Sequence, residues 1–147
     1  MNDKMSFDAW TSLFNGITNI AEPPTEVSAT PTETDTARFL LYMGFDDCVP
    51  DVLFALSRML SDAISRGKFC IKDIALEIAG SKPRSNALLS SIAYYIDKNY
   101  DNVRKSANIK YSANLPKTND GTKTFINRMS IIYSLYYLPE INEKKSS

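Results

Sequence analysis

The sequence predicts an all-α protein, a small orthogonal bundle of several helices. From Thr36 onward, apolar residues recur at the i, i+3, i+4, i+7 spacing of helices that bury one face, and no stretch alternates as a half-buried strand does. Pro50 stands where a helix can begin, and Gly67 and Gly80 stand where helices can end in a left-handed cap. With 147 residues, the chain is long enough for one domain with a real core.

The first 36 residues are predicted to lie apart from this domain. Residues 1–20 form a short amphipathic helix that begins after Ser6, with its apolar face made by Phe7, Trp10, Leu13, Phe14 and Ile17. This helix either folds back onto the domain or offers Phe7, Trp10 and Phe14 as anchors to a protein partner. Residues 21–36 hold three prolines, five threonines and four acids, a composition that predicts a flexible acidic linker.

The domain is expected over residues 37–140, and its first helices follow from clear signals. Thr36 is predicted to cap a short helix that runs through Tyr42. Pro50 then opens a long helix that Gly67 stops, with a buried stripe of Val52, Leu53, Leu56, Met59, Leu60, Ala63 and Ile64. A third helix covers 71–79 and is closed by Gly80.

Two more helices complete the predicted bundle. One follows Pro83 and places Leu88, Leu89, Ile92, Ala93, Tyr95 and Ile96 on its core face. The polar, basic stretch 102–123 is expected to be rich in turns. The last helix covers 124–138, Pro139 ends it, and residues 141–147 are predicted to be a disordered tail.

Composition excludes several classes of function. The chain has no histidine, and its two cysteines, Cys48 and Cys70, lack metal-type spacing, so neither a metal site nor a cofactor is expected. The usual general base is absent, and only five glycines are present, without a phosphate-binding loop, so we do not expect an enzyme. No window is apolar enough for a membrane span, and no secretory signal precedes the domain, which predicts a cytoplasmic protein without membrane contact.

The net charge of zero conceals two halves of opposite sign. Residues 1–63 contain 3 Lys and Arg against 10 Asp and Glu, a net charge of −7, whereas residues 64–147 contain 14 against 7, a net charge of +7. A basic half of this size suits a polyanion as partner, although the same charges could serve only to solvate a surface.

Residues 71–96 have the pattern of a helix-turn-helix. Ala75 is a small residue where two helices would cross, and "AGSKPRS" supplies the turn. The second helix carries short or forked polar groups opposite its core face, which suit contact with base edges and phosphates. The predicted DNA-binding residues are Ser81, Lys82, Arg84, Asn86, Ala87 and Ser90, and the predicted phosphate contacts are Lys98, Arg104, Lys105 and Lys110.

Several motifs in residues 39–138 resemble the C-terminal effector domain of the stage-zero sporulation response regulator family. "MGFDDCVPDVLFALSRML" resembles the opening of that domain, "DIALEIA" its first helix of the helix-turn-helix, and "KYSANLPKTNDGTKTFINRM" the loop leading into its last helix. Arg84 falls at the arginine near the start of the family's recognition helix. The resemblance implies a six-helix bacterial DNA-binding domain that regulates transcription.

The sequence also departs from this family. Asn86, Ala87 and Ser90 stand where the family's recognition helix has a glutamate and more arginines, so the family's DNA site is not carried over. The segment before Asp73 is shorter, and the receiver domain is absent, so control by phosphorylation is not expected. In the family the last helix helps to pair two domains on DNA. The resemblance therefore implies a homodimer with a share for Ile126, Met129 and Tyr133, unless these residues are core.

Three functions remain open from the sequence. The first is a sequence-specific regulator that binds double-stranded DNA. The second is a protein-interaction module, an adaptor or antagonist on the same scaffold, that uses the N-terminal helix. The third is a binder of single-stranded nucleic acid, with Tyr94, Tyr100 and Tyr111 as stacking platforms beside the basic residues of the same half.

Overall fold

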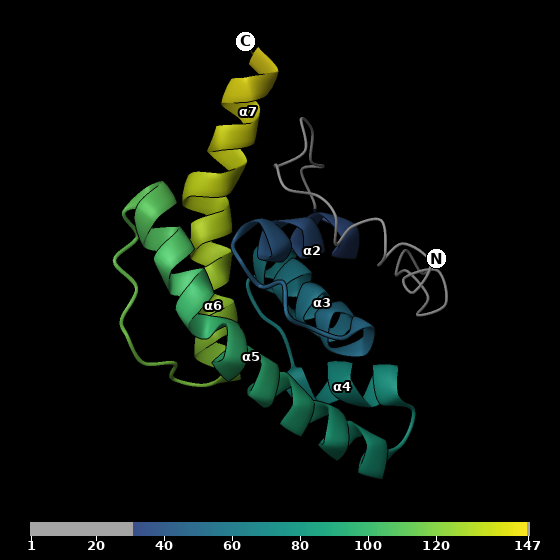
Figure 1. Ribbon diagram of the computed structural model, residues 1–147. Helices are drawn as coiled ribbons and strands as arrows, with labels where there is room; N and C mark the ends of the chain where they lie inside the picture. Colours follow the sequence, from purple (N-terminus) through teal and green to yellow (C-terminus); the bar gives the residue numbers. More distant parts are fainter. Residues whose placement is uncertain (1–30, 147) are drawn as a thin grey trace.

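The computed structural model describes residues 31–146, with side chains through Glu143 (Figure 1). Over this range the regular elements are helical and strands are absent, which confirms the predicted all-α class. In chain order the elements are α2 (Glu33–Tyr42), α3 (Pro50–Arg66), α4 (Ile71–Ala79), α5 (Lys82–Tyr111), α6 (Thr122–Ile132), the π-helix η1 (Tyr133–Tyr137) and α7 (Leu138–Ser146).

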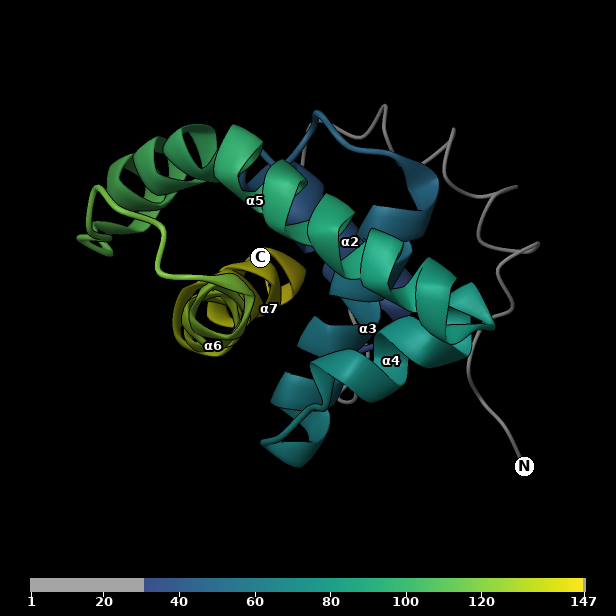
Figure 2. The same cartoon turned by 90° about the horizontal axis from the view of Figure 1, so that it is seen from below.

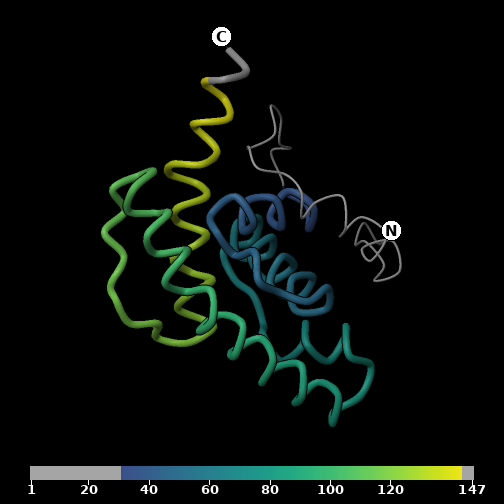
Figure 3. The backbone as a smooth tube through the Cα atoms, in the orientation of Figure 1, coloured from purple at the N-terminus to yellow at the C-terminus, as the bar shows by residue number. Residues whose placement is uncertain are grey.

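The helices form a bundle with a helical hairpin at one end. α6, η1 and α7 follow one another along one rod that ends at the C-terminus (Figure 1), and Figure 2 views this rod along its axis. The chain returns from the end of α5 to the start of α6 through residues 112–121 (Figure 3). At the other end of the molecule, α5 runs back along α4 (Figures 1 and 2). The N-terminal turns of α5 therefore lie far from α7.

The core is continuous from α2 to α7, and α3 is its centre. Every residue from Val52 to Leu60 on α3 is buried. Phe39 on α2 packs edge-on against Tyr133 and Tyr137, with ring centroids 5.2 and 4.8 Å apart. Such edge-to-face aromatic pairs add to the free energy gained from burial. The predicted α3 and α4 boundaries are confirmed, and Gly67 and Gly80 are left-handed caps with φ of 73° and 85°.

The start of α2 differs from the prediction that Thr36 caps it. Thr32 is the N-cap: its hydroxyl accepts the N–H of Asp35, and its own N–H donates to the Asp35 carboxylate, a capping box. Thr36 is instead fully buried, and its hydroxyl donates to the carbonyl of Ser57 at 2.8 Å. Residues 33–36 thus belong to the domain and not to the linker that was expected over 21–36. Residues 21–30 lie outside the described residues.

The connection between α2 and α3 is fastened to α5. The side chain of Asn99, which is buried, accepts the N–H of Asp47 and donates to the Asp47 carbonyl. Gly44 has a φ of 101°, and a Cβ there would lie 3.3 Å from the carbonyl oxygen of Asn102. Because a side chain would be both strained and crowded at this position, glycine allows the close approach of the two segments.

α5 is longer than the sequence predicted. It continues past Ile96 through Tyr111, so the first part of the expected turn-rich stretch 102–123 is helical. The sequence analysis did not recognise the buried face that continues along this part of the helix. It is formed by only a few residues, Asn99, Tyr100, Val103 and Ala107. Two of these four side chains are polar or amphipathic, which hid the helical period. The helix ends at Ser112, which has a φ of 52°.

Pro139 does not end the last helix, contrary to prediction, and the tail predicted over 141–147 is helical through Ser146. Before Pro139 the chain forms η1, in which the N–H of Leu138 bonds to the carbonyl of Tyr133, five residues back. A proline disrupts an α-helix because it lacks an N–H and its ring meets the preceding turn. The wider π-turn explains why the chain can pass through Pro139 and remain helical.

Candidate nucleic-acid interface

The candidate interface is the hairpin of α4 and α5, whose connection consists of Gly80 and Ser81. The N–H of Gly80 donates to the carbonyl of Leu76 at 2.8 Å and closes α4. The hydroxyl of Ser81 accepts the N–H of Arg84 and caps α5. This connection of two residues is shorter than the turn of a helix-turn-helix, which has roughly three or four residues. The local structure is therefore a tight helical hairpin with both ends capped.

Apolar side chains hold this hairpin against the body of the protein. Ile74 and Ala75 of α4 are buried, as are Leu88 and Ile92 of α5. Ala75 is fully buried, as expected for the small residue predicted at the helix crossing. Burial of about 25 cal/mol per Å² of apolar surface makes this packing the main force that fixes the start of α5.

The predicted DNA-binding residues come together on the first turns of α5. The exposed ones are Lys82, Arg84, Asn86, Ala87 and Ser90, and Ser81 is half-buried as the cap. Lys82 and Arg84 make no ion pair with any other described residue. Ala87 and Ser90 are three residues apart and share one face, because a helix turns about 100° per residue. Arg84 lies on the flank of this face.

A groove of about 580 Å³, which the sequence analysis missed, opens beside Arg84. It lies where the start of α3, the end of α4 and the start of α5 meet. Its lining residues are Pro50, Asp51, Ile78, Ala79, Arg84, Ala87, Leu88 and Ser91. Pro50 and Ala79 were recognised only as helix-boundary residues. No local pattern signals that these three helix ends meet, because the meeting is a product of tertiary packing.

The predicted phosphate contacts lie further along α5 and are largely occupied within the protein. Lys98 is paired with Asp47 at 2.9 Å, and this hydrogen bond raises the pKa of Lys98. Arg104 and Lys105 both pair with Asp101 at 2.9 Å. Their hydrogen bonds, Lys105 first, lower the pKa of the Asp101 carboxyl. Three of the four cations therefore have an acid as neighbour, which weakens the attraction they would exert on phosphate.

Lys110, the fourth cation, lies over an aromatic ring. Its ammonium is 4.6 Å from the ring centroid of Tyr42, a cation–π contact that joins the ends of α5 and α2. The hydroxyls of Tyr42 and Tyr111 both donate to the carboxylate of Glu140 on α7. Burial, followed by the nearby Glu140, raises the pKa of Tyr111. This end of α5 thus packs on α2 and α7.

The predicted stacking platforms for single-stranded nucleic acid are not all available. Tyr94 is 57% exposed, but Tyr100 is buried, and its hydroxyl donates to the carbonyl of Pro116 at 2.6 Å. Tyr111 is half-buried and stacks on Tyr136, with ring centroids 5.4 Å apart. The prediction for Tyr100 is wrong, since a base cannot stack on a ring that the core covers.

The dimer role implied for the last helix is also wrong for the three residues named. Ile126, Met129 and Tyr133 are at most 1% exposed and belong to the core. The large apolar residues that the same helical rod exposes are Ile131, Leu135 and Tyr136. The sequence left core burial open for these three residues, and this alternative is confirmed.

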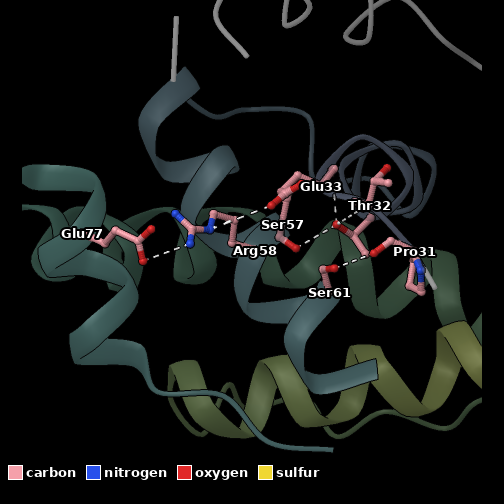
Figure 4. A network of polar contacts seen from close by, with 8 residues as sticks. Pro31, Thr32, Glu33, Ser57, Arg58, Ser61 and Glu77 are labelled. Carbon is pink, nitrogen blue, oxygen red and sulfur yellow. Dashed lines mark hydrogen bonds and ion pairs between the residues drawn. The ribbon is translucent and has the colours of Figure 1, made fainter. Parts of the chain in front are cut away.

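A buried cation, unnoticed in the sequence, connects three helices (Figure 4). Arg58 on α3 is 5% exposed, and its Nε lies 3.9 Å from the carboxylate of Glu33 on α2. Its Nη2 lies 3.0 Å from the carboxylate of Glu77 on α4, an ion pair that is not aligned as a hydrogen bond. Its guanidinium also lies over the ring of Phe54. Arg58 therefore ties α4, the first helix of the hairpin, to the start of α2.

Other predictions are left as predictions. Phe7, Trp10 and Phe14, the proposed partner-binding residues, lie outside the described residues, so the protein-interaction alternative is not tested. Among residues 31–146, no helix is long and apolar enough to cross a membrane. The same part of the chain contains no group of three or more side chains placed to hold a metal ion.

No family model, curated protein or solved structure matches this chain. The resemblance to the sporulation regulator family therefore also stays a prediction.

Proposed function

We propose that the chain is a sequence-specific regulator that binds double-stranded DNA through the first turns of α5. The observation that supports this proposal best is the pair Lys82 and Arg84. Both are exposed at the start of a capped helix and unpaired among the described residues, whereas Lys98, Arg104 and Lys105 on the same helix are paired with acids. Free positive charge on α5 is thus concentrated where the helix end is also exposed.

The side chains of these turns match the chemistry of a major groove. A guanidinium such as that of Arg84 can donate two hydrogen bonds to a guanine edge, and the amide of Asn86 can pair with an adenine edge. The methyl group of Ala87 can contact the methyl of thymine. The start of α5, with Ser81 and Lys82, offers positive charge to phosphates. Base contact and backbone contact would therefore come from one helix end.

The length and charge of α5 limit how it can lie on DNA. At 1.5 Å per residue its 30 residues span about 45 Å, far more than the roughly 12 Å width of a major groove. Asp97 is exposed further along the helix, and Asp101 there offsets part of the charge of Arg104 and Lys105. Only the first turns would therefore enter the groove. Because few phosphates are then contacted, the affinity should depend only weakly on salt.

The test compares two substitutions on a duplex selected from a random pool. Arg84→Ala should weaken the selected duplex by about 1–3 kcal/mol and relax the preference at one base pair. Lys82→Ala should weaken selected and random duplexes alike and lower the slope of log K against log salt by about one. Lys105→Ala is the matched control. Its ammonium is paired with Asp101, so it should change both affinities much less than Lys82→Ala.

Fluorescence anisotropy titrations at two salt concentrations measure these effects. Failure of the pool to enrich any motif would contradict the proposal. So would an equal loss from Arg84→Ala on selected and random duplexes.

A further inference from the structure

The groove beside Arg84 has an apolar floor, and its wall carries one cation, Arg84, and one acid, Asp51. Ile78 and Ala79 from α4 and Ala87 and Leu88 from α5 supply its apolar surface. Arg84 stands on the α5 side and has no ion pair among the described residues. A ligand for this groove should therefore offer apolar side chains, with an acid only on the side of Arg84.

We propose that the chain's own N-terminal segment, residues 6–20, docks in this groove and covers Arg84. The predicted helix of this segment places Phe7, Trp10 and Phe14 on one face at i, i+3 and i+7, the spacing with which helices enter apolar grooves. Residues 6–20 contain one acid, Asp8, and no lysine or arginine, a net charge of −1. Both properties that the groove requires thus occur in one segment.

The attachment point of this segment lies within reach of the groove. Pro31 is held on α3, because the hydroxyl of Ser61 donates to its carbonyl at 2.5 Å (Figure 4). Pro50, at the edge of the groove, lies eleven residues before Ser61 on the same helix, which is about 16 Å at 1.5 Å per residue. The ten residues 21–30 can span up to about 33–36 Å when extended. The connection is therefore about twice as long as this separation along α3.

Docking would regulate the proposed DNA binding, and this consequence rests on the proposed function. The guanidinium of Arg84 cannot meet an acid of the N-terminal segment and a base edge at the same time. DNA and the segment would therefore compete for the start of α5. The docking itself does not depend on DNA, so it can be measured without a duplex.

Trp10 is the only tryptophan in the chain, so its fluorescence reports directly on the segment. In the chain of 147 residues the emission of Trp10 should lie at shorter wavelength than in denaturant, and acrylamide should quench it weakly, independently of protein concentration. Ser91→Arg places a bulky cation in the groove and should shift the emission to longer wavelength and increase quenching. Ser134→Arg, on the distant rod, is the matched control and should leave both unchanged.

Circular dichroism verifies that each variant is folded. Should Ser91→Arg unfold the protein, Ala87→Glu at an exposed position repeats the test, since a new acid would repel the segment. Solvent-exposed Trp10 emission in the unmodified chain would overturn the proposal. Emission that changes with protein concentration would also overturn it, because the segment would then occupy a second copy or another site.

Duplex binding supplies the second measurement. Trp10→Ala combined with Phe14→Ala should raise duplex affinity, because Arg84 is then uncovered. The two proposals can fail separately. If Trp10 is shielded and groove substitutions expose it, but no duplex binds, the proposed function is refuted and the docking stands. If Trp10 of the unmodified chain is exposed to solvent and a specific duplex binds, the docking is refuted and the proposed function stands.

Discussion

Substitution of Arg58 tests how the hairpin is held, and its effect follows from the burial of the three charged groups. Arg58 is 5% exposed, and the side chain of Glu33 is 10% exposed, whereas the side chain of Glu77 is 51% exposed. Arg58→Met keeps an unbranched apolar side chain of similar length but leaves the Glu33 carboxylate buried and unpaired. Loss of one partner of a buried ion pair costs about 3–5 kcal/mol. We expect about 3 kcal/mol, because the 3.9 Å contact is long.

Glu77→Gln should have a much smaller effect. Half of the Glu77 side chain is in solvent, where an ion pair contributes about 0.2–1 kcal/mol, and Arg58 keeps Glu33 as its partner. The double variant Arg58→Met with Glu33→Gln should be more stable than Arg58→Met alone, since it removes the unpaired charge.

Urea denaturation followed by circular dichroism measures these free energies of unfolding. Lys72→Met, an exposed position on α4, is the control and should change stability by less than about 0.5 kcal/mol. The reasoning would be refuted if Arg58→Met cost no more than Glu77→Gln. It would also be refuted if removing the Glu33 charge restored nothing.

The remaining predictions concern one glycine and the two cysteines. Gly44→Ala should destabilise the fold by about 2 kcal/mol or more in the same assay, because φ of Gly44 is 101° and the new Cβ would meet the Asn102 carbonyl. Gly67→Ala is the control: its new Cβ would lie in open space, so the substitution should cost about 1 kcal/mol. At pH 8, iodoacetamide should modify exposed Cys70 much faster than half-buried Cys48, as mass spectrometry would show. The reason is that burial raises the pKa of Cys48 to about 12, so little of its reactive thiolate is present. The folded state keeps the Cys48 thiol neutral, whereas the thiol of the unfolded state ionises near pH 9. The free energy of unfolding should therefore fall as pH rises from about 9 to 12. In urea titrations, Cys48→Ala should make this fall less steep.

Local signals in the sequence were sufficient for several elements. Pro50 and Gly67 bound α3 because each acts through its own backbone, whatever its distant neighbours are. The same holds for Gly80 and for the exposed polar start of α5. The capping box of Thr32 was also local, but the acidic, threonine-rich composition around it favoured a linker instead.

Features that depend on distant partners were not predictable in this way. The buried stripe of α5 beyond Ile96 includes Asn99, whose burial becomes favourable only when the backbone of Asp47 supplies hydrogen bonds. The positive charge at Lys98 looked free in the sequence, and only the folded chain pairs it with Asp47 of the connection between α2 and α3.

The sequence by itself determined that the chain is helical, where most helices begin and end, and which residues occupy the exposed start of α5. These features depend on spacing, caps and backbone freedom within a few residues. The tertiary structure alone decided that Lys98 is paired with Asp47, that Asn99 is buried against the same connection, and that three helix ends enclose a groove beside Arg84. These depend on contacts between segments far apart in the chain, whose energies no local pattern contains.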